Sequence, residues 1–283
     1  MITAVHFLLT YACNFECDHC FLYCGPRSEG TFTLAQLREA FDQIDQLGTV
    51  QSVYFEGGEP FLYYPLMLEG IRMAGRRGLQ VGVVTNNYWA TAEEDAALWL
   101  EPLAELGISD LSISDDRFHR GASEPVTARA ASAAAGKLGM PVSVLSVEDL
   151  EGGLMIKGRA ADTVGKELPR RPWRELTSCP YEELEKPKRV HLDPFGWVHL
   201  CQGLTMGNIN SRPLAAMAAE YDAAKHPICG PLVEGGPALL AERYGVEHGE
   251  EYVDECQLCY LTRLALIDRF PRFLAPRQVY GLS

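Results

Sequence analysis

The sequence predicts an α/β fold, an open (β/α)6 partial barrel followed by a small C-terminal domain. In the first 160 or so residues, short apolar runs alternate with amphipathic stretches, a pattern typical of parallel sheets with helical connections. About six such runs occur, fewer than the eight strands of a closed TIM barrel. After Arg159 prolines and charges crowd residues 168–188, so we expect domains at 1–165 and 166–283.

The expected elements follow one another in a regular order. Strands are expected at residues 5–10, 50–55, 79–85, 110–114, 142–146 and 154–157. Helices are expected at residues 34–47, 66–77, 93–106 and 126–138. The connection between the last two strands is too short for a full helix, so this unit is expected to be degenerate.

Size and charge exclude several classes of function. The chain has 283 residues and a net charge of -13, and no basic run that would favour nucleic acid or an anionic membrane. It shows neither a signal peptide nor an apolar run near the ~20 residues of a membrane helix. We therefore expect a cytoplasmic protein, whose nine cysteines bind metal rather than form disulfides.

Three cysteines stand directly after the first expected strand. Cys13, Cys17 and Cys20 have the spacing C-x3-C-x2-C. Three thiolates can hold a [4Fe–4S] cluster and leave one iron open for another ligand. The alternative is a zinc site completed by His19, Cys24 or a distant residue. The position after a parallel strand, where α/β folds place their chemistry, favours the cluster.

This triad resembles the CxxxCxΦC motif of the radical S-adenosylmethionine (SAM) superfamily, with His19 where an aromatic residue is frequent. Three more motifs end successive expected strands. Gly57-Gly58-Glu59-Pro60 resembles the family's GGE motif, and Thr85-Asn86-Asn87 resembles its Thr-Asn-Gly. Ser112-Ile113-Ser114-Asp115 resembles the strand end that meets the SAM ribose. Four motifs in the family's order are far more specific than one, and the resemblance covers roughly residues 5–160.

The resemblance implies a role for each motif. The three cysteines would hold the cluster, whose open iron binds the amino and carboxylate groups of SAM. Gly57 and Gly58 would let the backbone approach the methionyl part, and Glu59 would accept hydrogen bonds from the amino group. The other predicted cofactor-binding residues are Asn86, Ser112, Ser114, Asp115 and His19. The alternatives are a simple turn for the glycines, a solvated strand end for Ser112, Ser114 and Asp115, and a loop cap for Asp115 and Asp116.

A second set of cysteines follows the expected domain boundary. Cys179, Cys201, Cys256 and Cys259 are enough for a closed [4Fe–4S] cluster or a structural zinc site, and Cys229 is the alternative to Cys179. An expected hairpin around residues 193–196 precedes Cys201. The layout resembles the twitch domain, a shortened relative of the SPASM domain, and is closest to the 2-deoxy-scyllo-inosamine dehydrogenase type.

The resemblance implies radical chemistry on a substrate C–H bond. A flavodoxin- or ferredoxin-type reductant would reduce the first cluster, SAM would give a 5′-deoxyadenosyl radical, and an auxiliary cluster would accept an electron from a small molecule. Arg159, after the last expected strand, is predicted to orient or deprotonate the substrate; the alternative is a solvated basic turn. Alternative functions are maturation of a ribosomally made peptide by thioether or carbon–carbon crosslinks, or a non-catalytic zinc or electron-transfer protein.

Overall fold

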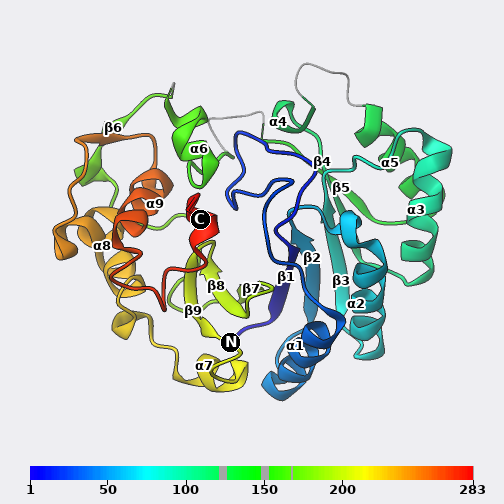
Figure 1. Ribbon diagram of the computed structural model, residues 1–283, viewed down its shortest axis with the longest axis horizontal. Helices are drawn as coiled ribbons and strands as arrows, with labels where there is room; N and C mark the ends of the chain where they lie inside the picture. The colour runs from blue at the N-terminus through cyan, green and yellow to red at the C-terminus, as the bar shows by residue number, and fades with distance from the viewer. Residues whose placement is uncertain (121–125, 148–152, 167, 283) are drawn as a thin grey trace. The chain divides into compact units, whose positions relative to one another are not determined.

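The computed structural model describes residues 1–120, 126–147, 153–166 and 168–282 (Figure 1). The chain forms two compact units, which are described separately. The sheet unit consists of Thr3–Phe15 and Gly25–Leu154, and the cysteine unit of Met1–Ile2, Glu16–Cys24 and Met155–Ser283. The cysteine triad is therefore divided, with Cys13 in the sheet unit and Cys17 and Cys20 in the cysteine unit. The predicted division into domains at residue 165 stays a prediction.

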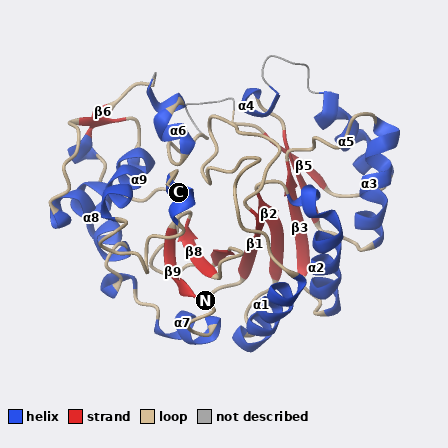
Figure 2. Ribbon diagram, in the orientation of Figure 1, coloured by secondary structure: helices blue, strands red, loops and turns tan. Residues whose placement is uncertain are grey.

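The sheet unit is built on parallel strands, as the alternating pattern predicts (Figure 2). They are β1 (Ala4–Thr10), β2 (Ser52–Gly57), β3 (Gln80–Thr85), β4 (Asp110–Ser114) and β5 (Val142–Leu145). Their order is β5-β4-β3-β2-β1, and each neighbouring pair is parallel. All carboxyl ends therefore lie at one edge of the sheet, and the predicted α/β class is confirmed.

Helices connect these strands. They are α1 (Leu34–Leu47), the 3-10 turn η1 (Pro60–Tyr63), α2 (Tyr64–Arg76), α3 (Glu93–Glu105), α4 (Arg117–Arg120) and α5 (Val126–Lys137). Thr33 and Gln36 form a capping box at the start of α1, and Gly48 ends the helix in the left-handed conformation. Phe41 of α1 packs against Phe7 of β1, whose ring stacks on Phe55 of β2, so helix and sheet share one aromatic core.

The prediction of a sixth strand at residues 154–157 is wrong. Residues 154–157 are all described and form no strand; residues 148–152, just before them, lie outside the described residues. The backbone N–H of Ile156 instead donates to the Asp254 carboxylate at 3.0 Å, within the cysteine unit. The apolar run reflects burial of an irregular segment, in which Lys157 N donates to the Met155 carbonyl oxygen at 2.9 Å and a side chain satisfies Ile156 N. Apolar runs this short do not distinguish that arrangement from a strand.

The cysteine unit combines a small meander with helices. The strands β7 (Arg189–Leu192), β8 (Trp197–Cys201) and β9 (Leu204–Asn208) pair antiparallel, which confirms the predicted hairpin. The remaining elements are α6 (Arg159–Asp162), η2 (Val164–Lys166), β6 (Arg171–Pro172), η3 (Trp173–Glu175), α7 (Leu214–Glu220), η4 (Ala223–Lys225), α8 (Cys229–Tyr244), β10 (Glu251–Tyr252), α9 (Glu255–Leu266) and η5 (Arg277–Tyr280). Across the described part of the chain, no helix has the length and apolar character needed to span a membrane.

Candidate functional site

Cys13 lies just beyond the carboxyl end of β1, with two N–H donors near its sulfur. The backbone N–H of Phe15 donates to its sulfur at 3.4 Å, and the side-chain amide of Asn86 lies 3.6 Å from the same atom. Asn86 also donates to the side-chain oxygen of Asn14 at 2.9 Å. Asn86, a predicted SAM-binding residue, thus lies beside a predicted cluster ligand. Its N–H group would stabilise the Cys13 sulfur when that sulfur is charged.

The two glycines of the GGE motif are required by a close approach of backbone segments. Gly58 donates to the carbonyl oxygen of Thr10 at 2.7 Å, and Glu59 donates to that of Ala12 at 3.0 Å. A Cβ atom on Gly57 would lie 2.4 Å from the Thr10 oxygen, and one on Gly58 would lie 2.2 Å from the Ala12 oxygen. The motif thus holds the segment that leads into Cys13, and contact with the methionyl part of SAM stays a prediction.

Glu59 is a fully buried carboxyl group at the carboxyl edge of the sheet. Its Oε1 accepts hydrogen bonds from Phe61 N and Thr85 Oγ1, and its Oε2 accepts one from Asn86 N at 2.7 Å. Burial raises the pKa of Glu59 to about 7, against the opposing effect of these hydrogen bonds. A carboxyl group that ionises near neutrality can respond to a cationic amino group placed beside it.

The end of β3 explains a departure from the family's Thr-Asn-Gly. Asn87 stands where that motif has glycine, and its φ is +52°. Asparagine is among the few residues that tolerate this left-handed conformation, so the turn is kept. The Asn87 amide donates to the carbonyl oxygen of Ser114 at 2.7 Å and so joins the ends of β3 and β4.

The predicted ribose-binding residues have different surroundings. Ser112 is buried and donates to the carboxylate of Asp110 at 2.7 Å, whereas Ser114 and Asp115 are half-buried. Asp116 caps α4, because its Oδ1 accepts from the backbone of Phe118 and His119. Of Asp115 and Asp116, the two alternative cap residues, Asp116 makes the cap, and the ribose contacts stay predictions.

Cys17 and Cys20 lie on a tight loop of the cysteine unit, with His19 half-buried between them. Cys20 N donates to the Cys17 carbonyl oxygen at 3.1 Å, and Cys24 N donates to the Cys20 sulfur at 3.3 Å. The side-chain hydrogen bond with Cys24 is the largest influence on Cys20 and outweighs burial, so the pKa of this thiol falls to about 6. Cys20 is thus a thiolate at neutral pH, the form that binds metal.

Arg159 donates hydrogen bonds to the backbone of this loop. Its guanidinium donates to the carbonyl oxygens of Cys17 and Cys24, and its backbone N–H donates to that of Cys20. Gly158, with φ +60°, allows the approach, since a Cβ there would lie 2.5 Å from the Cα of Phe21. This loop-holding role was not predicted from the sequence, where its only signal is the glycine before Arg159. The substrate role of Arg159 stays a prediction.

The second set of cysteines lies in the cysteine unit, where the thiols influence one another electrostatically. Cys201 ends β8, and Cys256 and Cys259 lie one turn apart on α9. The Cys201 thiol interacts electrostatically with those of Cys179, Cys256 and Cys259. Burial raises the pKa of Cys259 to about 11 and that of Cys179 above its ordinary value. Such thiols become thiolates readily only when a metal takes the place of the proton.

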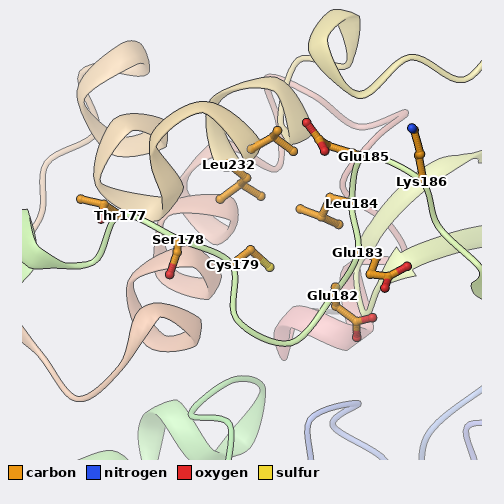
Figure 3. A pocket seen from close by; sticks show the side chains of 10 residues that line it. Thr177, Ser178, Cys179, Glu182, Glu183, Leu184, Glu185, Lys186 and Leu232 are labelled. Atoms are coloured by element: carbon orange, nitrogen blue, oxygen red, sulfur yellow. The ribbon is translucent and has the colours of Figure 1, made fainter.

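Cys179 and Cys229 differ in their access. Cys179 borders a cavity of about 490 Å³, and Figure 3 shows it on the loop that also carries Glu182 and Glu183. Cys229 begins α8, is fully buried and shares a side-chain hydrogen bond with Tyr221. Burial raises the pKa of Cys229 to about 12, and its thiol also interacts with those of Cys201 and Cys259. Cys179 is therefore the more accessible of the two candidates for a fourth ligand.

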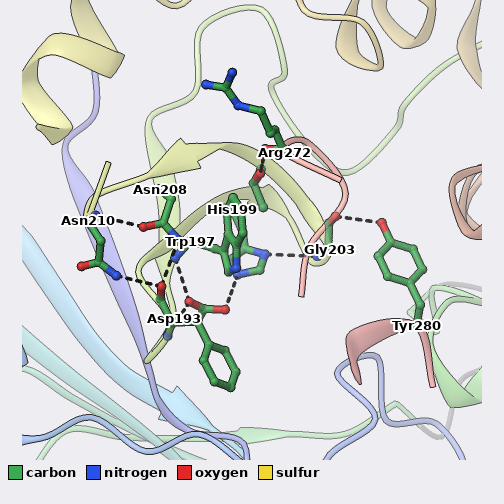
Figure 4. A network of polar contacts seen from close by, with 10 residues as sticks. Asp193, Trp197, His199, Gly203, Asn208, Asn210, Arg272 and Tyr280 are labelled. Carbon is green, nitrogen blue, oxygen red and sulfur yellow. Dashed lines mark hydrogen bonds and ion pairs between the residues drawn. The ribbon is translucent and has the colours of Figure 1, made fainter. Parts of the chain in front are cut away.

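A buried network fixes the strand that carries Cys201 (Figure 4). Asp193 accepts hydrogen bonds from the backbone of Phe195 and Trp197, and its other oxygen lies 3.2 Å from His199 Nε2. His199 Nδ1 accepts from Gly203 N at 3.1 Å, so Nε2 carries the proton and donates to Asp193. The hairpin turn and the turn after Cys201 are thereby joined through one imidazole.

Two cations are buried beside these thiols. Lys157 is 2% exposed, and its ammonium donates to Gln202 Oε1 at 2.6 Å and lies 3.7 Å from the sulfur of Cys201. Arg263 is 1% exposed and donates to the Gln202 carbonyl oxygen at 2.9 Å, while its Nε is buried without a hydrogen-bond partner in the described structure. Buried cations need compensating negative charge. Four thiolates that hold a cluster would supply it, so the donor set fits an anionic metal centre.

Comparison with known proteins bears on the first part of the chain. The sequence model of the radical SAM superfamily matches residues 7–146. The chain carries a radical SAM domain. This domain implies a [4Fe–4S] cluster and SAM as cofactors, and it contains Cys13, the GGE motif and the ends of β3 and β4.

Relatives of the radical SAM domain have varied descriptions. The putative peptide biosynthesis protein YydG of Bacillus subtilis is 27% identical over 107 residues, 38% of this chain and 34% of YydG. An S-adenosylmethionine-dependent nucleotide dehydratase of Psychrobacter lutiphocae is 30% identical over 94 residues, 29% of this chain and 32% of the relative. The match thus spans about a third of these curated relatives' lengths.

A solved structure extends the likeness of fold. The crystal structure of BtrN in complex with AdoMet and 2-DOIA matches with a TM-score of 0.54 and 17% identity, and covers 77% of this chain and 82% of BtrN. Because the radical SAM match covers only about half of the chain, the shared fold continues past it.

Proposed function

We propose that the protein is a radical SAM enzyme that oxidises a small molecule and uses a second [4Fe–4S] cluster as electron acceptor. The observation that carries the proposal is the grouping of cysteine thiols and two buried cations in the cysteine unit, in a chain that also has a radical SAM domain. The likeness of fold to BtrN, which was solved in complex with AdoMet and 2-DOIA, supports a small-molecule substrate.

The proposal gives each residue group a task. Cys13, Cys17 and Cys20 hold the first cluster, and Cys179, Cys201, Cys256 and Cys259 hold the second. Asn86 and the Phe15 backbone stabilise the Cys13 thiolate, and Arg159 keeps the loop of Cys17 and Cys20 in shape. Glu59 accepts the amino group of SAM, while His19, Ser112, Ser114 and Asp115 provide polar contacts.

The cofactors, when bound, supply the one-electron chemistry. With an alcohol as substrate, SAM would supply the 5′-deoxyadenosyl group that takes one hydrogen atom from carbon, and the second cluster would supply the acceptor for one electron. Loss of the hydroxyl proton would complete the oxidation, so that methionine, 5′-deoxyadenosine, the carbonyl compound and a proton would result. A flavodoxin- or ferredoxin-type protein provides the starting electron. The protein's task is to hold the reacting carbon in place and to exclude water.

A second candidate function is maturation of a ribosomally made peptide. It is favoured by the descriptions of YydG and of the subtilosin biosynthesis protein AlbA of Bacillus subtilis, which is 32% identical over 80 residues, 28% of this chain and 17% of AlbA. Deuterium transfer into 5′-deoxyadenosine distinguishes the two. We expect it from carbon-deuterated cyclic amino alcohols, and transfer only from a deuterated peptide would establish the alternative.

Iron and sulfide analysis under anaerobic conditions tests the cofactor content. We expect about eight irons in the wild type, about four after Cys13, Cys17 and Cys20 are all changed to Ala, and about four in Cys179→Ala. Cys229→Ala is the matched control and should keep about eight, since its thiol is not a ligand in this proposal. About four irons in the wild type and none in the triple variant would remove the second cluster. Zinc in its place would support a structural role.

A further inference from the structure

We propose that Lys157 and Arg263 raise the reduction potential of the second cluster, by offsetting its negative charge and donating hydrogen bonds to its sulfur atoms. The inference rests on the proposed second cluster. It assigns to two buried cations the task of making that cluster an electron acceptor.

Lys157 reaches the cysteines from a segment that precedes the cysteine-rich part of the unit. Its ammonium contacts a neutral amide and a thiol, those of Gln202 and Cys201, and lies 5.4 Å from the ring centre of Phe21. None of these partners is a carboxylate, and the side chain is fully buried. The Cys201 thiolate is therefore the counter-charge in contact with this ammonium, and the carboxylates of Glu182 and Asp254 interact with it electrostatically as well.

Arg263 occupies the same face of α9 as two proposed ligands. Cys256, Cys259 and Arg263 are spaced i, i+3 and i+7, so the three side chains follow one side of the helix. The guanidinium interacts electrostatically with the thiols of Cys259, Cys201 and Cys256. One Nη atom is used by Gln202, whereas the buried Nε has no hydrogen-bond partner among the described residues. A sulfur atom of a bound cluster would satisfy this donor.

One residue fixes both the lysine segment and the ligand helix. Asp254 Oδ1 caps α9 by accepting from Gln257 N at 2.8 Å, and its Oδ2 accepts from Ile156 N at 3.0 Å. Lys157 is thus held at the start of the helix that carries Cys256 and Cys259. The approach of the cation to the thiols is built into the backbone rather than left to a flexible side chain.

The physical effect has a definite sign. A [4Fe–4S] cluster with four thiolates is negatively charged, and reduction adds another negative charge. Fixed cations in a buried, low-dielectric site stabilise the more negative state, and N–H donors to sulfur act in the same direction. Lys157 and Arg263 therefore favour reduction, as an electron acceptor for a substrate radical requires.

Redox titration followed by EPR tests the inference. The parent is the full chain with Cys13, Cys17 and Cys20 changed to Ala, so that only the second cluster gives a signal. Lys157→Met, Arg263→Met and Arg263→Gln remove one charge each, whereas Lys157→Arg and Arg263→Lys keep it. Lys225→Met is the matched control: it changes the net charge equally, in the same unit, at a side chain that is 85% exposed.

We expect each charge-removing variant to decrease the equilibrium constant for cluster reduction at least tenfold, which is ~59 mV toward negative potential for one electron. The charge-keeping variants and Lys225→Met should stay close to the parent. Variants that retain the cluster at an unchanged potential would overturn the inference and leave the proposed function standing. A parent without iron would instead overturn the proposed second cluster itself.

Discussion

The guanidinium of Arg159 donates a hydrogen bond of 2.7 Å to the carbonyl oxygen of Cys17. A second, of 2.8 Å, goes from the same guanidinium to the carbonyl oxygen of Cys24. A planar guanidinium presents several donors in a fixed fork, whereas a lysine ammonium is a compact point charge. Arg159 can therefore bridge the two ends of the loop that carries Cys17 and Cys20.

Removing this bridge should loosen the first cluster. We expect Arg159→Met to release iron to a chelator about a hundredfold faster than the wild type, because two charged hydrogen bonds are lost, each contributes about 1.5 kcal/mol, and ~1.4 kcal/mol corresponds to a factor of ten. Arg159→Lys should be intermediate. Arg174→Met, at an arginine that is 70% exposed, is the control and should behave as the wild type.

A different outcome would support the substrate role that the sequence predicts for Arg159. Iron retention equal to that of the wild type, together with loss of substrate turnover, would mean that Arg159 acts on the substrate. Iron release, measured without substrate, keeps the two roles separate.

The sheet unit was predictable because its signals are local. Strands such as β4 and helices such as α1 follow from hydrophobic periodicity and end signals within a few residues of one another. The strand predicted at residues 154–157 was wrong because this apolar run is buried without strand pairing. Its Ile156 donates instead to Asp254, almost a hundred residues away. No local pattern contains that contact.

Gly58 should tolerate no side chain. In Gly58→Ala the new Cβ would lie 2.2 Å from the carbonyl oxygen of Ala12, and the backbone before Cys13 would have to move. We expect a loss of about 3 kcal/mol or more in the free energy of unfolding, at the upper end for overpacking. Anaerobic denaturation and iron content measure it, and iron should fall with stability.

Gly136→Ala is the matched control. Gly136 lies on the exposed side of α5, and a Cβ there would meet no atom within 4 Å. Alanine in a helix should raise stability by roughly 0.5–1 kcal/mol. Equal effects of the two substitutions would contradict the close approach of the GGE turn to residues 10–12.

The candidate site was predictable in its ligands but not in its surroundings. The spacing of the cysteines can be read directly from the sequence, so Cys13, Cys17 and Cys20 could be predicted as ligands. Lys157 and Arg263 could not be selected, because the residue type alone does not show whether a cation is buried or solvated. Their burial depends on the packing of segments about a hundred residues apart.

The buried carboxyl of Glu59 should make stability depend on pH. Its pKa is about 7 in the folded protein and near 4.5 in an unfolded chain, so the folded state holds a proton that the unfolded state has lost between these values. The free energy of unfolding should therefore fall as pH rises through this window, by up to about 3 kcal/mol. Glu59→Gln removes the ionisation and should remove this part of the decrease.

SAM gives the same experiment a functional readout. If Glu59 accepts the amino group of SAM, the cationic ligand favours the ionised carboxylate, and SAM should raise the midpoint of anaerobic thermal denaturation more at pH 8 than at pH 5. In Glu59→Gln the SAM-induced rise should be smaller and alike at both pH values. Glu101→Gln, at an exposed position of α3, is the control and should keep the wild-type difference. A pH-independent effect of SAM in the wild type would separate Glu59 from SAM binding and leave its role to the folding of the sheet edge.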